Sequence, residues 1–292
     1  MNVQSIIEDT ALKLLKLAAV KLPEDVKGAL RRAYEAERNP VGRISLKNIL
    51  ENIRLAEEKN IPICQDTGLV AFYVKAGSEF KGLGLIERAL IKAVRRATLE
   101  VPLRPNAVDF FTNKNSGDNV GRFTPYIQWD LFDGEYVEVT ALLKGGGSEN
   151  ACALNMMKPS DGLNGLKKFV VESVIKSGGL PCPPAIIGIG LGGGADIAMA
   201  LAKKALLKPL DEENPNGEAA ELERDLYKII NMTGIGPMGL GGDVTTLAVK
   251  VEYAHRHPAS YPVAVAFQCW AARKAAARIY SGGEVEYLTH KV

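Results

Sequence analysis

Four cysteines, at positions 64, 152, 182 and 269, are the residues of this sequence best suited to bind a metal. Cys64 begins a polar turn, Cys182 lies between two prolines, and Cys269 follows an apolar run. Thiolates at rigid loops are the ligands that a soft metal centre needs. Cys152 lies among small apolar residues and is predicted to be a packed core thiol. The spacing matches no local metal signature, so buried structural cysteines remain an alternative at this point.

A glycine-rich segment, Lys144-Gly-Gly-Gly-Ser148, has the composition of an anion-binding loop. Backbone N–H groups converge in a glycine turn, and the absence of Cβ atoms lets an anion approach them closely. The lysine and the hydroxyl add further donors. A carboxylate or phosphate is the expected ligand, and a tight turn between a strand and a helix is the alternative.

A second glycine segment, with Gly188, Gly190 and Gly193, satisfies the GxGxxG pattern of dinucleotide-binding proteins. The acidic residue expected about 20 positions later would be Asp211, which lies in a polar connection and not at the end of a strand. The βαβ unit is therefore missing. A nucleotide-dependent oxidoreductase remains a remote alternative.

These segments must be positioned by a mixture of helices and short strands. Apolar residues at helical spacing predict helices within 3–36 and 43–59. The apolar patterns of the rest of the chain predict further helices and several strands. The predicted helices cover 84–99, 162–176, 195–206, 218–230 and 269–280, and the predicted strands cover 69–76, 124–131, 135–143, 185–189 and 244–252. The two strands around Asp133-Gly134 are predicted to form a hairpin, and residues 101–119 are predicted to be irregular. We expect an α+β fold with small sheets in a single domain over 1–292, whose N-terminal part, about 1–60, is helical.

Composition excludes several classes of protein. A hydrophobic share of 47% and a charged share of 24% are typical of a folded globular protein. The net charge of +2, from 36 Lys and Arg against 34 Asp and Glu, argues against nucleic acid as a partner. Glu8 and Asp9 disfavour a secretory signal, and no apolar run is long enough to span a membrane. We therefore expect a cytoplasmic protein with reduced cysteines.

Four segments together resemble the class I, iron–sulfur-dependent fumarate hydratases. They are Cys64-Gln-Asp-Thr-Gly68, Lys144-Gly-Gly-Gly-Ser-Glu-Asn150, Cys182-Pro-Pro-Ala185, and His255-Arg-His-Pro-Ala-Ser260 ahead of Phe267-Gln-Cys-Trp270. The chain most resembles the α subunit of the two-subunit fumarase and L(+)-tartrate dehydratase family, over nearly its whole length. The resemblance implies the fold of the cluster-binding N-terminal domain of class I fumarases.

The resemblance further implies a [4Fe–4S] cluster held by Cys64, Cys182 and Cys269, whereas Cys152 matches no family ligand. Three protein thiolates leave one iron of such a cluster without a protein ligand. An open coordination position of this kind acts as a Lewis acid toward a bound oxygen.

The family's substrate pocket maps onto Gln65, Asp66, Arg104 and Gly147. Arg104 would clamp one carboxylate of a small dicarboxylate, and the Gly147 N–H would bind a second oxygen. Asp66 is the expected catalytic residue near the hydroxyl or water, and a structural ion pair between it and Arg104 is the alternative. His257 matches a catalytic family histidine, although a histidine before proline also serves to brace a loop.

The implied activity is a hydro-lyase that hydrates fumarate to L-malate, which would place it in the tricarboxylic acid cycle. Dehydration of L(+)-tartrate to oxaloacetate is the close alternative, because the same motifs serve both substrates. A non-catalytic cluster carrier or assembly protein is a third hypothesis. Single-chain members continue into a second domain, so the resemblance implies a separate β subunit that supplies the proton-transferring base, in an assembly built on an α homodimer (α2β2).

Overall fold

The computed structural model describes residues 2–292 and divides the chain into two compact units. Unit 1 comprises Met1–Glu24, Asn52–Gly146 and Arg273–Val292, and unit 2 comprises Asp25–Glu51 and Gly147–Ala272. The sequence predicted one domain and gave no boundary. Each unit is assembled from separated stretches of chain, so no single linker marks the division.

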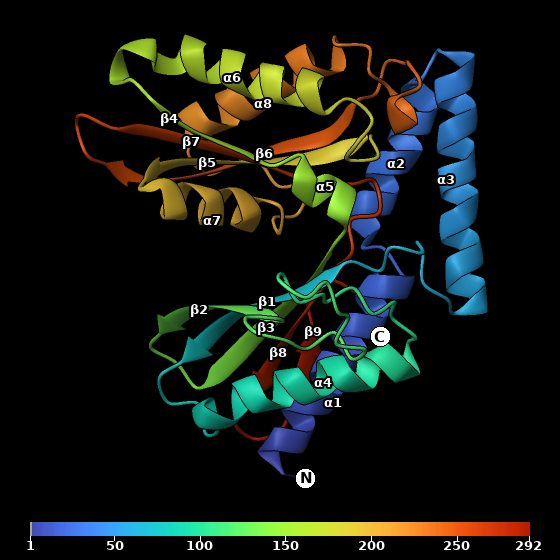
Figure 1. Cartoon of the computed structure of the whole chain (residues 1–292), viewed down its shortest axis with the longest axis vertical. Coiled ribbons are helices and arrows are strands. Elements are labelled where there is room, and N and C mark those ends of the chain that lie inside the picture. Colours follow the sequence, from blue (N-terminus) through green and yellow to red (C-terminus); the bar gives the residue numbers. More distant parts are fainter. Residues whose placement is uncertain (1) are drawn as a thin grey trace. The chain divides into compact units, whose positions relative to one another are not determined.

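Unit 1 is built on a five-stranded sheet in the order β2-β1-β3-β8-β9. Its strands are β1 (Leu69–Gly77), β2 (Tyr126–Phe132), β3 (Tyr136–Lys144), β8 (Lys274–Tyr280) and β9 (Val285–Tyr287). Two long helices, α1 (Val3–Val20) and α4 (Ile86–Glu100), lie along the sheet in Figure 1, and a short helix η1 (Leu83–Leu85) precedes α4. Side chains from both helices and from three strands form one apolar core.

The core of unit 1 follows directly from the sequence periodicities. Buried residues of α1 recur every three or four positions, as in Ile7, Ala11 and Leu14. Buried residues of β1 alternate, as in Phe72 and Val74, because successive side chains of a strand point to opposite faces.

Unit 2 is built on a four-stranded sheet in the order β4-β7-β5-β6. Its strands are β4 (Ala153–Met157), β5 (Ala185–Gly193), β6 (Thr246–Arg256) and β7 (Tyr261–Gln268). Figure 1 shows α6 (Gly162–Ser177) and α8 (Gly217–Asn231) on one face of this sheet and α7 (Ala195–Ala205) on the other. The shorter helices are α5 (Gly146–Asn150), η2 (Pro159–Asp161) and η3 (Pro237–Gly239). The N-terminal helix α2 (Glu24–Ala36) belongs to this unit almost entirely, and the unit boundary falls within α3 (Pro40–Lys59).

The predicted α+β class is confirmed, together with most elements and the irregular segment before β2. The hairpin prediction is wrong, because β2 pairs in parallel with β1 and β1 pairs antiparallel with β3. The chain between β2 and β3 crosses the end of β1, where Ser78 N donates to Phe132 O (2.8 Å) and Glu79 N donates to Gly134 O (2.9 Å). A turn signal predicts a reversal of the chain, but it carries no information about an earlier strand inserted between the two arms.

The predicted helix over 269–280 is also wrong, because Lys274–Tyr280 forms β8 between β3 and β9. Its alanines favour a helix when the segment is considered alone. In the fold, Ala275, Ala277 and Ile279 alternate into the core of unit 1, and the pairing with β3 overrides the local preference. The short strand β4 had not been predicted.

Candidate functional site

The polar turn at Cys64–Gly68 lies between α3 and β1 in unit 1, and its centre is the carboxylate of Asp66. Asp66 Oδ1 accepts hydrogen bonds from Gly68 N (3.0 Å) and from Asn106 Nδ2 (3.3 Å). Asp66 Oδ2 accepts one from Gly146 N (2.9 Å). Three donors from three segments therefore fix the orientation of this carboxylate.

The segment that carries Arg104 is fastened to the same turn. Arg104 N donates to Thr67 Oγ1 (3.0 Å), and the Arg104 carbonyl accepts from Asn119 Nδ2 (3.2 Å). The buried Asn119 also accepts from Asn106 N (2.6 Å). These bonds hold the backbone of Arg104 beside the Asp66 turn, while its side chain is exposed to solvent.

A buried arginine also donates a hydrogen bond to this turn. Arg273 is 1% exposed, and its Nη1 donates to the backbone carbonyl of Asp66. Its Nε has no hydrogen-bond partner among the described residues 2–292. A buried guanidinium with an unsatisfied N–H costs free energy, and the hydrogen bond to the Asp66 carbonyl offsets part of that cost.

The glycine-rich segment after β3 binds the carboxylate of Asp66, a side chain of the protein itself. Lys144 ends β3 and is buried, and the N–H of Gly146 is occupied by Asp66. A Cβ at Gly147 would lie 2.5 Å from the carbonyl oxygen of Leu180, so only glycine fits there. The segment therefore positions Asp66, and the expected open anion loop is partly filled by it.

Cys182 and Cys269 lie at the same end of the sheet in unit 2. Cys182 precedes β5, and Cys269 directly follows β7, which pairs antiparallel with β5. Trp270 N donates to the carbonyl of Cys182 (3.3 Å), so the two segments are neighbours. Both thiols are half-buried and outside any disulfide. Cys182 has a φ of 51°, a left-handed conformation that non-glycine residues adopt rarely and mostly at constrained or functional positions.

Cys64 belongs to unit 1, where its half-buried thiol lies 3.9 Å from Gln65 Oε1. Partly accessible thiols outside any disulfide are suited to a thiolate-bound group. No three His, Cys, Asp or Glu side chains within residues 2–292 converge as a preformed site for a metal ion.

Cys152 does not lie in the core as predicted. It is half-buried, its Sγ lies 3.6 Å from the carbonyl of Ser148, and it lines a cavity of about 500 Å³ beside α6. The small residues around it pack less closely than their apolar character suggested, because β4 runs along the edge of the sheet.

His257 lies in the turn between β6 and β7, at the opposite end of β7 from Cys269. The eight residues of β7 span about 25 Å. His257 Nδ1 accepts from Ala259 N (3.1 Å), and Arg256 ties the turn by donating to the His257, Pro258 and Ser260 carbonyls. The structure therefore does not bring His257 to Cys269 within unit 2, and the geometry matches that of a residue that braces the loop.

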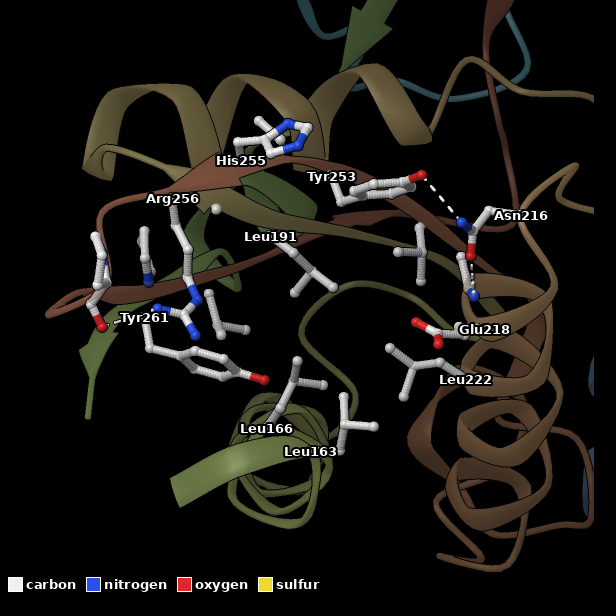
Figure 2. Close-up of a pocket in the computed structure, with 17 residues that line it drawn as sticks. Leu163, Leu166, Leu191, Asn216, Glu218, Leu222, Tyr253, His255, Arg256 and Tyr261 are labelled. Carbon is white, nitrogen blue, oxygen red and sulfur yellow. Dashed lines mark hydrogen bonds between the residues drawn. The ribbon is translucent and has the colours of Figure 1, made fainter. Parts of the chain in front are cut away.

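A larger cavity of about 660 Å³ lies at the His257 end of unit 2 (Figure 2). Its leucines come from α6, α8 and β5, and its polar rim includes Asn216, Tyr253 and Arg256. Asn216 Nδ2 donates to Tyr253 Oη (3.0 Å), so part of the rim is already paired. The cavity holds none of the predicted site residues.

The second glycine segment does not form a phosphate-binding loop. Gly188 and Gly190 lie inside β5, where a Cβ would meet the carbonyl oxygens of Ala202 (2.1 Å) and Ala198 (1.9 Å). These glycines let α7 pack directly on the strand. The GxGxxG pattern is therefore explained by close helix packing, which removes the support for a nucleotide site.

In unit 1 the structure brings together the turn that carries Gln65 and Asp66, the backbone of Arg104, and Gly146. Sequence reasoning did not identify Asn106, Asn119 and Arg273, which position that group. Asparagines in an irregular segment give no periodic signal. Arg273 follows Cys269 by four residues, but only the pairing of β8 with β3 reveals its direction.

None of the helices within residues 2–292 combines the length and apolar character needed to cross a bilayer.

Comparison with known proteins agrees with the resemblance. The family model described as "Fumarate hydratase (Fumerase)" matches residues 8–278. A protein of Methanocaldococcus jannaschii named "Putative L(+)-tartrate dehydratase subunit alpha" is 46% identical over 277 residues, which cover 94% of this chain and 97% of the relative. Proteins named "L(+)-tartrate dehydratase subunit alpha" from Escherichia coli UTI89 and K12 are 37% and 36% identical, each over 94% of this chain and 91% of its own length. With a family model and relatives that match nearly its whole length, this chain is a hydro-lyase of the fumarate hydratase family, of the class I two-subunit type.

Proposed function

We propose that this chain is the α subunit of an L(+)-tartrate dehydratase, which removes water from L(+)-tartrate to give oxaloacetate. The observation that carries the proposal is that relatives 36–46% identical over more than nine-tenths of both chains bear this name. The preference for fumarate expected from the sequence therefore gives way to its alternative. Fumarate hydration is the second candidate, favoured by the description of the matching family model.

We assign a [4Fe–4S] cluster to Cys64, Cys182 and Cys269. The support is the resemblance together with three half-buried thiols outside any disulfide. Cys182 and Cys269 lie on neighbouring segments, and Cys182 has a left-handed backbone conformation. The cluster would supply a Lewis-acidic iron with an open position for a substrate oxygen.

The remaining chemistry of this chain concerns a dianionic substrate. The exposed Arg104 guanidinium is suited to a bidentate contact with one carboxylate, and its fixed backbone limits the freedom of the side chain. Gln65 adds an amide donor, and we assign Gly147 N–H to a further substrate oxygen. Water is lost when a proton leaves one carbon and the hydroxyl leaves its neighbour, and the enol that forms rearranges to oxaloacetate.

We assign to Asp66 the hydrogen bond to the substrate hydroxyl, with the carboxylate held by Gly68, Asn106 and Gly146. A carboxylate offers about four lone-pair positions, so the three internal bonds leave room for one substrate contact. We place the base that takes the carbon-bound proton on the β subunit. His257 has no role at the cysteines of its own chain in this proposal, because β7 separates it from Cys269.

The proposed assembly pairs this chain with a β subunit on an α homodimer. The relatives' names include "subunit alpha", which is the support for a second kind of chain. We also place the protein in a reducing, cytoplasmic compartment, because none of its four cysteines lies in a disulfide.

The test is anaerobic reconstitution with iron, sulfide and the β subunit encoded in the same genome. Rates are measured in parallel for L(+)-tartrate and fumarate. We expect kcat/KM for tartrate to exceed that for fumarate by at least about tenfold, because a site that binds the second hydroxyl discriminates against a substrate without it. The reverse preference would establish the fumarate candidate, and no turnover of either substrate would contradict both.

A further inference from the structure

Unit 1 carries an exposed apolar surface that its own core does not use. We call it the aromatic surface, and its members are Phe110, Phe111, Phe123, Trp129 and Leu131. Phe110 and Phe111 are 87% and 89% exposed. Exposed aromatic side chains contribute a large apolar area to an interface when a partner covers them.

The loop that presents the two phenylalanines is fixed by hydrogen bonds. Asp109 Oδ1 accepts from Phe111 N (3.2 Å), Thr112 N (2.8 Å) and Thr112 Oγ1 (2.8 Å). The backbone hydrogen bond from Thr112 is the main cause of a pKa of Asp109 below its usual value, so the carboxylate stays charged at neutral pH. The two rings meet edge to face, with centroids 5.4 Å apart. A loop ordered before binding loses little entropy when a partner arrives.

The rest of the surface lies on and before β2, at the outer edge of the five-stranded sheet. Trp129 and Leu131 pair with Val74 and Ala76 of β1 and so share their face. The β1 residues are buried in the core of unit 1, whereas Trp129 and Leu131 are exposed. The apolar face of the sheet thus continues beyond the part that α1 and α4 cover. Such an uncovered edge is a site at which proteins associate.

The aromatic surface is continuous in the chain with the proposed substrate site. Asn115 Nδ2 donates to the Pro105 carbonyl (2.6 Å), and Ser116 N donates to the Ala107 carbonyl (3.0 Å). Asn106, in the same segment, donates to Asp66. A subunit that completes the site at Asp66 and Arg104 must therefore approach this segment.

We propose that the aromatic surface is the docking surface for the β subunit, with Phe110 and Phe111 as its anchors. The inference rests on the proposed function, which requires a second subunit to complete the site. The matching surface of that subunit is apolar and receives the paired phenylalanine rings in a pocket. A partner seated here also covers the edge strand β2 and excludes water from the Arg104 segment.

The experiment compares the wild-type chain with Phe110→Asp/Phe111→Asp, and Kd for the β subunit is measured by calorimetry without oxygen. Two buried aromatic anchors predict a loss of affinity of about 100-fold or more. The matched control is Ile44→Asp/Met232→Asp, which places the same charge at two exposed apolar residues of unit 2 and should bind like the wild type. Phe110→Ala/Phe111→Ala, which adds no charge, should weaken binding by at least about tenfold.

The outcomes separate this inference from the proposed function. An aspartate double variant that binds the β subunit as tightly as the wild type overturns the docking surface and leaves the function intact. Loss of α–α association with unchanged β binding assigns the surface to a second copy of the chain and also overturns the inference. A wild-type chain that turns over tartrate without any partner overturns both.

Discussion

Asp66 shows how residues far apart in sequence hold one carboxylate in place. Its carboxylate is bound by Gly68, Asn106 and Gly146, and its backbone carbonyl by the buried Arg273. The sequence motif was sufficient to predict Asp66 and the presence of a glycine loop. It did not predict that the glycine loop binds Asp66 itself, because that contact depends on the pairing of β1 with β3.

The first prediction concerns Asp66→Asn. The amide nearly preserves the volume of the carboxylate but removes its charge and directs an N–H₂ group toward one of the backbone donors. We expect kcat to fall by about 10²–10³-fold, as for loss of one preorganised hydrogen-bonding group at a reacting oxygen, with an unchanged iron content. Loss of iron together with activity would show instead that Asp66 supports the fold of the Cys64 turn.

The second prediction compares two cysteines. Cys64→Ser should abolish the cluster absorbance of anaerobically reconstituted protein, whereas Cys152→Ser should retain it along with full turnover. The reason is that Cys152 lines a separate cavity beside α6 and is absent from the assigned ligand set. Equal iron loss in both variants would contradict the assignment.

At the scale of elements, the third glycine segment, residues 234–242, supports the segment that carries Cys182. Met238 N donates to the carbonyl of Pro183 (2.7 Å), and Gly239 lies against Gly179. The buried Glu37 anchors the far end of this segment, since its carboxylate accepts from Asp243 N (2.9 Å) and Val244 N (3.0 Å).

The third prediction follows from this anchor. Glu37→Gln replaces one acceptor oxygen by an N–H₂ group that faces backbone donors, so we expect the free energy of unfolding to fall by about 1–3 kcal/mol. Alkylation of Cys182, followed by peptide mass spectrometry, should become faster in the cluster-free protein. Arg38→Ala removes a neighbouring solvent-exposed ion pair with Asp243 and should change neither quantity. An unchanged alkylation rate of Cys182 in Glu37→Gln would contradict the claim that residues 234–242 support the segment that carries Cys182.

Elements whose apolar residues recur with a clear helical or strand period were predictable from the sequence. Elements that depend on pairing or packing with distant segments were not. The helices α1, α6 and α8 have apolar faces that any local analysis finds. The strand β8 is rich in alanine, and only its burial between β3 and β9 makes it a strand. Gly190 in β5 likewise fits a nucleotide motif in sequence. Only the structure shows that it serves helix packing, because a Cβ at this position would clash with the carbonyl oxygen of Ala198.

At the scale of the whole molecule, the chain divides into two compact units. The sequence predicted one domain because no repeat or low-complexity linker marks a boundary. The two units were not predictable, since each is interrupted and the boundaries fall within or beside regular elements such as α3.

The most direct test of the account is Mössbauer spectroscopy of the air-free, ⁵⁷Fe-reconstituted complex of this chain with its β subunit, with and without L(+)-tartrate. Three thiolates for four irons predict one iron that differs from the other three, and its spectrum alone should change when tartrate binds. A cluster with four equivalent irons that does not respond to tartrate, or the absence of any cluster, would contradict the account.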